Sequence, residues 1–396
     1  MNSLRERLAR FDGSPRPVVR RDAIDRECAW AQRLGWTKSS ELVDWHLVRS
    51  EFGPALDAVD RSSWHRLTGD HELPPLPWAI LDTETTGLES GTGTLVIVTA
   101  VLRIEASGSR LIQRFLPDPA AEDSFLRGLC EDLAGLGALL SYNGKSFDLP
   151  RLRARLRLHK MGESQLDRPH LDLVHFCRRL AAGWLEDARL ASVETHLLGL
   201  QRQGDLPGAE VPAIYRRWLQ CGDADDLDRV FSHNRRDVEH LHLLLQHVAA
   251  LLANPTESQL PESCGLAIGR LLEARQLWGE AEHCYASLLQ RSGPKFLPRV
   301  GLHWARLARR RGDLALAMRL CESIAGERWE GVLARIELAK LYEHKLRDFD
   351  AAHAQTQTAL RELSQLSVHA EDLALRLQLR LERLQRRRSV RAAESA

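Results

Sequence analysis

Several features that mark whole classes of protein are scarce or missing in this chain. No apolar run approaches the ~20 residues that a membrane helix needs, so the sequence predicts no membrane contact. Its seven cysteines include no Cys-x-x-Cys pair, which argues against both a disulfide framework and a cysteine zinc site. The first residues lack the apolar core of a secretory signal. Together these absences predict a cytoplasmic protein.

Net charge is also almost absent. The 55 Lys and Arg residues and the 54 Asp and Glu residues leave a formal charge of +1. The field of the whole molecule therefore neither favours nor excludes a nucleic acid, and any surface that binds one must be local. At 396 residues the chain exceeds one ordinary hydrophobic core, so we expect two or more domains.

The N-terminal part of the chain carries few signals of regular strands. Residues 1–76 read as a helical and irregular region that ends in a proline-rich linker, because Glu72-Leu-Pro-Pro-Leu-Pro77 cannot continue a helix. Four tryptophans in this region are expected to anchor its packing: Trp30, Trp36, Trp45 and Trp64.

Residues 77–253 show the pattern of a mixed α/β sheet with flanking helices. Strands are expected at 78–82, 94–105 and 109–116, the last two joined by a hairpin turn. A helix over 121–133 and a short strand over 138–141 follow, and the pattern beyond residue 149 is almost wholly helical. Three antiparallel strands, a helix and a returning strand build such a sheet.

Residues 262–366 are helical and show a rough internal repeat. Ala281, Ala317 and Ala352 each lie at the start of the second helix of a pair, with spacings of 36 and 35 residues. This period is close to that of tetratricopeptide repeats, although a plain helical bundle would give a similar pattern. Residues 367–396 read as a basic final helix and tail.

Two acidic residues follow the first strand of the sheet. Asp82 and Glu84 lie two positions apart in Asp82-Thr-Glu-Thr-Thr-Gly-Leu88, so a strand projects both from the same face. Carboxylates aimed at one point repel each other unless a cation joins them, and hard divalent cations favour oxygen ligands. The alternative is a solvated strand end.

A second acidic position lies where a strand passes into a helix. In Ser141-Tyr-Asn-Gly-Lys-Ser-Phe-Asp148, the Asn143-Gly144 pair predicts a turn and Asp148 falls near the helix start. The positive end of the helix dipole tolerates an anion there. A simple helix cap would explain Asp148 equally well.

A third position lies inside a helix expected over residues 226–248. His233 and Asp237 are four residues apart and share one face. A histidine beside a metal-bound carboxylate can accept a proton from water, although a surface His-Asp pair is the plainer interpretation.

Taken together, the strings LDTETTGL, YNGKSFDLP and HNRRDVEHL resemble the three exonuclease motifs of the DEDD superfamily. Residues 75–250 also resemble the YprB-type RNase H-like family through GTGTLVIVTAV, LDLVHFCRRL, ASVETHLLGLQRQGDLPGAEVPAIYRRWL and SHNRRDVEHLHLLL. In one departure, His233 lies four residues before Asp237. The histidine form of these enzymes places its histidine five residues before the aspartate, and the tyrosine form places its tyrosine four before.

The resemblance implies an RNase H-like fold and a hydrolase that cuts phosphodiesters, usually from 3′ to 5′, with two Mg²⁺ or Mn²⁺ ions. The implied metal ligands are Asp82, Glu84, Asp148 and Asp237, with His233 as the general base. The expected substrate is single-stranded DNA or RNA, and the helical repeats could bind a protein partner. An RNase H-type endonuclease and a binding scaffold without turnover are the alternatives.

Weaker candidates lie beside these motifs. Five residues are candidates for contacts with the substrate: Thr85, Asn143, Lys145, Ser146 and Arg151. The basic side chains at 151, 153, 155, 157 and 160 could hold phosphates or could pair with nearby acids. Asp172 could lie beside the metal ligands or cap a helix.

Overall fold

A computed structural model describes the chain except for residues 1–30, 33, 40–45, 57–58, 88–92, 257–259, 327, 367–369 and 395–396. The chain divides into two compact units. Residues 1–178 and 185–250 form the first unit, and residues 179–184 and 251–396 form the second. In the described ranges, no helix combines the length and the apolar character needed to cross a membrane.

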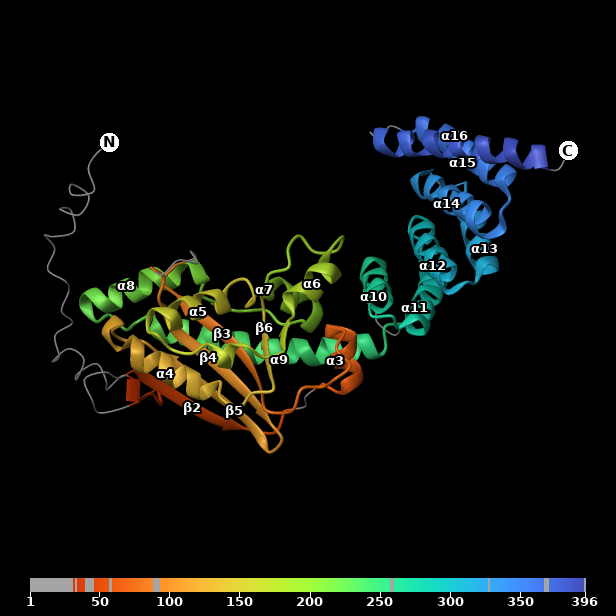
Figure 1. The fold of residues 1–396 in the computed structure, drawn as a ribbon. Helices are drawn as coiled ribbons and strands as arrows, with labels where there is room; N and C mark the ends of the chain where they lie inside the picture. The colour runs from red at the N-terminus through yellow and green to blue at the C-terminus, as the bar shows by residue number, and fades with distance from the viewer. Residues whose placement is uncertain are drawn as a thin grey trace, which may run out of the picture. The chain divides into compact units, whose positions relative to one another are not determined.

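A seven-stranded mixed sheet forms the centre of the first unit (Figure 1). Its strands lie in the order β1-β2-β5-β4-β3-β6-β7. Neighbouring strands from β1 to β3 in this order are antiparallel, and β6 and β7 run parallel to β3. Their bounds are β1 Thr37–Lys38, β2 Leu47–Gly53, β3 Trp78–Thr85, β4 Val96–Glu105, β5 Gly108–Phe115, β6 Ala138–Ser141 and β7 His170–Asp172.

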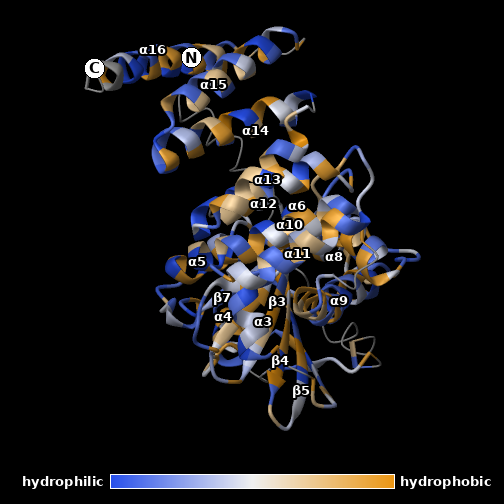
Figure 2. Ribbon diagram, turned by 90° about the vertical axis from the view of Figure 1, so that its right-hand side faces the viewer, coloured by the Kyte–Doolittle hydropathy of each residue, from blue (hydrophilic) through white to orange (hydrophobic). Residues whose placement is uncertain are grey.

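Helices cover both faces of this sheet. Because β3 lies between β4 and β6, it is buried on both of its faces. On one face, Leu81 of β3 packs in a core with side chains of α4 and α5. On the other face, Phe115 of β5 packs with side chains of α8 and α9. Figure 2 shows β3 and β4 largely in the hydrophobic colour, as two-sided burial requires. The helices are α3 Arg61–Thr68, α4 Glu122–Asp132, α5 Asp148–Leu158, α6 Val174–Ala181, α7 Leu190–Val193, α8 Val211–Cys221 and α9 Leu227–Ala253.

The mixed α/β sheet and its β4-β5 hairpin are confirmed, but three strands, β1, β2 and β7, were missed. The expectation of a helical and irregular N-terminal region is wrong for β2, which pairs with β5 along its whole length. Only Leu47 of β2 is buried, so the apolar alternation that reveals a strand is absent. The expectation of an almost wholly helical chain after residue 149 is wrong for β7, which is too short to show any period.

Two of the four tryptophan anchors can be placed. Trp36 and Trp64 are both 1% exposed, and Trp64 lies with its ring centroid 5.3 Å from that of Trp78. Both are therefore packing residues, as expected. Trp30 and Trp45 lie outside the described residues.

The second unit is built from helical hairpins. Ala281, Ala317 and Ala352 are fully buried in α11, α13 and α15, the second helix of each pair. At Gly269 of α10, an added Cβ would lie 2.4 Å from the Tyr285 ring of α11, so a glycine allows the close approach. The assignment to tetratricopeptide repeats stays a prediction. The helices are α10 Glu262–Ala274, α11 Trp278–Arg291, α12 Leu297–Arg311, α13 Leu314–Ile324, α14 Arg328–Leu341, α15 Phe349–Ser364 and the basic α16 Glu371–Glu394.

Candidate metal centre

Asp82 and Glu84 lie at the end of β3 and point to the face of the sheet that α9 covers. Asn234 of α9 donates a hydrogen bond from Nδ2 to Asp82 Oδ2 at 2.7 Å. Glu84 Oε1 lies 3.6 Å from His233 Nε2 on the same helix. The irregularity in the β3-β4 register falls between Glu84 and Thr85, where the strand leaves the sheet. The strand alternation therefore places the two carboxylates as the sequence predicted.

A buried amide chain holds Asn234 in place. Asn234 is 0% exposed, and its Oδ1 accepts a hydrogen bond from Gln113 Nε2 of β5 at 3.2 Å. Gln113 Oε1 in turn accepts from Arg49 of β2 at 2.6 Å. The unexpected strand β2 thus supports the side chain that orients Asp82.

Asp148 is the first residue of α5 and approaches from the opposite face of the sheet. Its Oδ1 accepts a hydrogen bond from Thr83 Oγ1 at 2.5 Å, and Thr83 lies between the two acids of β3. The preceding turn is tight: Asn143 has φ 69°, and a Cβ at Gly144 would lie 3.2 Å from Asp148 Oδ2. The turn and the helix start expected from the sequence are therefore both present.

Asp172 fixes that turn from β7. Its carboxylate accepts hydrogen bonds from the backbone N–H groups of Asn143 at 2.7 Å and Lys145 at 3.0 Å. It also accepts from the Val174 N–H at 3.2 Å, next to the start of α6. Asp172 thus positions the second motif through its backbone.

His233 and Asp237 lie one turn apart on α9, as the sequence predicted. His233 Nε2 lies 3.8 Å from Asp237 Oδ2. Its other ring nitrogen, Nδ1, lies 2.8 Å from Asp205 Oδ1. An ionised Asp205 can only accept, so Nδ1 donates to it and the neutral ring keeps an acceptor at Nε2. That nitrogen faces Glu84 and Asp237.

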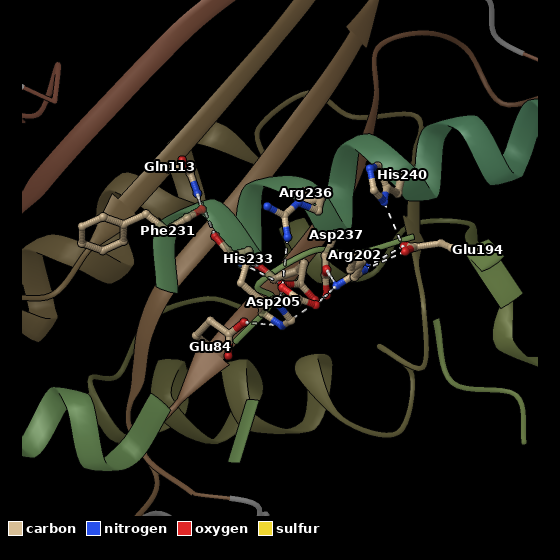
Figure 3. A network of polar contacts seen from close by, with 12 residues as sticks. Glu84, Gln113, Glu194, Arg202, Asp205, Phe231, His233, Arg236, Asp237 and His240 are labelled. Carbon is tan, nitrogen blue, oxygen red and sulfur yellow. Dashed lines mark hydrogen bonds and ion pairs between the residues drawn. The ribbon is translucent and has the colours of Figure 1, made fainter. Parts of the chain in front are cut away.

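Arg202 links Asp237 to a buried acid that sequence analysis did not single out (Figure 3). Its guanidinium binds both oxygens of Glu194 at 2.6 Å, and Glu194 is 0% exposed. The same guanidinium lies 2.7 Å from Asp237 Oδ1 and 3.0 Å from Asp205 Oδ2. Arg202 therefore holds one oxygen of Asp237, while Oδ2 stays directed toward His233.

The carboxylates of the three motifs disfavour each other's ionised form. Burial raises the pKa of Asp82 well above its usual range, and Asp237, Asp148 and Glu84 raise it further. Burial and the charges of Asp237, Asp148 and Asp205 do the same to the pKa of Glu84. Burial also raises the pKa of Asp148 to about 6 against the opposing Thr83 bond. The pKa of Asp237 is raised by burial although His233 and Arg202 lower it.

These side chains fit a hard divalent cation by their chemistry, because all four motif acids offer carboxylate oxygens. In the part of the chain that the structure describes, no three His, Cys, Asp or Glu side chains are gathered closely enough to hold an ion. Asp82, Asp148 and Asp237 instead bind Asn234, Thr83 and Arg202. The acids share one region, where an added cation would relieve the raised pKa values.

A family model matches the part of the chain that holds these acids. Residues 79–249 match the model of the RNase H superfamily. The chain carries an RNase H superfamily domain. The matched range spans β3 to α9 and includes Asp82, Glu84, Asp148 and Asp237.

One curated protein and one solved structure were also found. Uncharacterized protein YprB of Bacillus subtilis (strain 168) is 29% identical over 315 residues, which cover 78% of this chain and 74% of YprB. A family B DNA polymerase structure from the archaeon Pyrobaculum calidifontis aligns at 14% identity with a TM-score of 0.35. That alignment covers 63% of this chain but only 33% of the polymerase, and at this TM-score it carries no argument. The match to the RNase H superfamily supports nuclease activity, and a nuclease acts on nucleic acid.

The five residues expected to contact substrate differ in how far they are exposed. Lys145 and Ser146 are exposed, and Asn143 is partly exposed beside them. Thr85 is buried and donates its hydroxyl to the Gly87 carbonyl at 2.7 Å. Of the five candidates, all of which the structure describes, those in the turn at 143–146 have side chains that a substrate could reach.

The expectation that Arg151 and the basic residues after it hold substrate phosphates is wrong for the side chains that are buried or paired. Arg151 is 3% exposed, donates to the Phe147 carbonyl at 2.7 Å and stacks on the Phe147 ring, so it packs inside the domain. Arg155 is buried against Glu122. Arg153 and Arg157 both pair with Glu163, which realises the alternative of a helix face paired to nearby acids.

The raised pKa of Asp148 predicts a pH-dependent stability difference. In the folded state this carboxyl holds its proton up to about pH 6, whereas an unfolded aspartate loses it near pH 3.9. The free energy of unfolding therefore falls as pH rises through that window. Above it, the folded protein carries the full cost of an ionised, buried Asp148. We expect metal-free Asp148→Asn to unfold at a higher temperature than the metal-free parent at pH 7.5, with the gap closing toward pH 4. A gap independent of pH would contradict this expectation, and Asp70→Asn, at an exposed position with no ion pair among the described residues, is the control.

Proposed function

We propose that this protein is a metal-dependent nuclease that hydrolyses phosphodiester bonds as a 3′–5′ exonuclease. One observation carries the proposal. Four carboxylates from β3, α5 and α9 lie in one region, where burial raises all four pKa values and the neighbouring acids raise those of Asp82 and Glu84 further. Such an arrangement is costly at neutral pH without a counter-charge, and divalent cations provide one.

In this proposal Asp82, Glu84, Asp148 and Asp237 would hold two Mg²⁺ or Mn²⁺ ions. Bound there, the ions supply Lewis acidity for the attacking and leaving oxygens of an in-line displacement. Arg202 keeps Asp237 Oδ1 occupied at 2.7 Å, which leaves Oδ2 for an ion. Asn234 holds Asp82 in a similar way. Its Nδ2 donates to the Asp82 backbone carbonyl at 3.3 Å and to Asp82 Oδ2 at 2.7 Å.

His233 is the proposed proton acceptor. Its Nε2 faces the carboxylates, and its Nδ1–H is held by Asp205 at 2.8 Å. This contact fixes the ring orientation and stabilises the positive charge that forms when Nε2 takes a proton from the attacking water. Asp205 is itself tied to Arg202 and to Arg236 at 3.1 Å, so its position is determined on three sides.

The polarity of cleavage has a direct test. With Mg²⁺ present, single strands of DNA and RNA are supplied with a label at the 3′ or the 5′ end, alongside a circular strand of the same sequence. We expect the 3′ label to be released first as a mononucleotide, the 5′-labelled strand to shorten gradually, and the circle to stay intact. A linearised circle would establish an endonuclease instead. Intact strands in every arm would favour a binding scaffold without turnover.

A further inference from the structure

A basic pocket in the second unit lies outside everything assigned to the RNase H-like centre. It has a volume of about 590 Å³, within the roughly 300–1,000 Å³ of ligand pockets. Its wall brings together the end of α6, the start of α10 and the segment leading into α12. Its charged residues are Arg179, Arg270, Arg299 and Glu262.

The three arginines of this pocket have no acidic partner. All are exposed, and across the described ranges none of Arg179, Arg270 and Arg299 forms an ion pair or a side-chain hydrogen bond. Most other arginines of the second unit are committed: Arg306 and Arg309 pair with Glu337, and Arg310 pairs with Glu273. The guanidinium groups of the pocket are therefore available to an external anion.

The one acid of the pocket is already engaged. Glu262 Oε1 accepts a hydrogen bond from the Gly293 N–H at 2.7 Å, which directs this carboxylate to a loop. Three arginines and one glutamate leave two net positive charges on the wall. The N-terminus of α10 adds to them, because Glu262 and Ser263 open this helix of 13 residues at the pocket. Close by, burial and then Arg270, Arg306 and Arg299 lower the pKa of His303 to about 4.

An aromatic ring completes the site. Phe296 lines the pocket, and the Arg299 guanidinium lies 5.6 Å from its ring centroid. Unpaired arginines beside an aromatic ring are the combination that single-strand-binding grooves use, since the guanidinium forks bind phosphates while bases stack on the ring. An acidic peptide would satisfy the charges but would leave the ring without a role.

We propose that the pocket formed by Arg179, Arg270, Arg299 and Phe296 binds the phosphate backbone of single-stranded nucleic acid. This inference deepens the proposed nuclease function and rests on it, because it gives that substrate a second contact site in the helical unit. The contact is independent of base sequence, since guanidinium–phosphate pairs position a strand without reading it.

The test is binding without turnover. The full chain carrying Asp82→Asn is titrated against a fluorescent oligothymidylate in the presence of a chelator, and anisotropy is followed between 50 and 200 mM salt. In this background Arg270→Glu with Arg299→Glu should weaken binding about 10-fold or more. The slope of log affinity against log salt should fall by roughly 1.4, or about 0.7 for each lost phosphate contact on a single strand.

A matched control separates a local site from net charge. Arg319→Glu with Arg328→Glu makes the same charge change at exposed positions of α13 and α14 outside the pocket, and it should leave affinity and slope nearly unchanged. Equal losses in both double variants, or no loss in the first, would overturn the proposal. Because the pocket arginines are exposed, both variants should fold, and the milder pair Arg270→Gln with Arg299→Gln should show a smaller loss in the same direction.

A competition arm identifies the ligand. Poly-glutamate at matched charge concentration should displace the oligothymidylate poorly. Displacement as effective as that by unlabelled oligothymidylate would assign the pocket to an acidic protein segment and overturn the proposal. The outcome is independent of whether the chain hydrolyses phosphodiesters, so failure here and failure of the nuclease proposal are distinguishable.

Discussion

Replacing Asp82 by Asn is expected to reduce phosphodiester hydrolysis by about 10³-fold or more while the protein stays folded. The change keeps the side-chain shape but removes one of the four carboxylates that would hold the metal ions. Metal-assisted stabilisation of the transition state is worth several kcal/mol, and each ~1.4 kcal/mol is a factor of ten in rate. The measurement is the initial rate of mononucleotide release at saturating Mg²⁺.

Stability distinguishes this loss from unfolding. Since burial and three neighbouring acids raise the pKa of Asp82, its neutralisation should leave thermal stability unchanged or higher in the metal-free protein. Asp123→Asn makes the same chemical change on the exposed surface of α4 and should keep the full rate. An Asp82→Asn protein that is folded and hydrolyses at the normal rate would remove the basis for the proposed enzyme.

Replacing His233 by Ala is expected to lower the rate by ~10²–10⁴-fold with little loss of metal affinity. Proton acceptance at Nε2 is lost, whereas the four carboxylates keep their places. Because a general base must be unprotonated to act, the wild-type rate should decline toward acid pH, and the alanine variant should lack that component. The pH–rate profiles of both proteins are compared at saturating Mg²⁺, because protonation of the carboxylates also weakens metal binding.

Two variants sharpen this experiment. Asp205→Asn keeps an acceptor for the His233 Nδ1–H but removes the charge, so a smaller loss of rate and a displaced acid limb are expected. His175→Ala removes an exposed histidine of α6 and should change neither rate nor profile. Parallel profiles and similar rates for wild type and His233→Ala would reduce His233 to a residue of the helix surface.

The parts of the site that lie within short motifs could be predicted from sequence. Asp82 and Glu84 follow from strand alternation, and His233 and Asp237 follow from the spacing of one helical turn. The turn at Asn143-Gly144 follows from its residue types. Each depends on neighbours a few residues away, so local pattern carries enough information.

The supporting contacts could not be predicted, because they join segments far apart in the chain. Arg202 lies in an irregular stretch before α8, and Glu194 opens the short π-helix Glu194–Leu198. Only the fold brings Arg202 to both Glu194 and Asp237. Asn234 did offer a signal, because it directly follows His233 inside the third motif. Its link to Gln113 spans 121 residues and depends on the sheet order.

The ion pairs between charged side chains were the least predictable feature. Arg151 looked like a phosphate-binding side chain from its position after Asp148, but burial turned it to the Phe147 ring. The basic side chains of α5 form ion pairs with acids of other segments; Arg155, for example, pairs with Glu122 of α4. A sequence shows which charges exist, whereas tertiary packing decides which of them are neutralised.

Removal and return of divalent metal distinguishes a metal-dependent nuclease from a protein that needs no metal ion. The purified chain is stripped with a chelator, assayed on labelled single-stranded DNA and RNA, and assayed again after Mg²⁺ or Mn²⁺ is added. The account predicts no hydrolysis in the stripped protein, restored hydrolysis with either ion, and no restoration in Asp82→Asn. Hydrolysis that persists in the chelator, or that returns equally in Asp82→Asn, would contradict it.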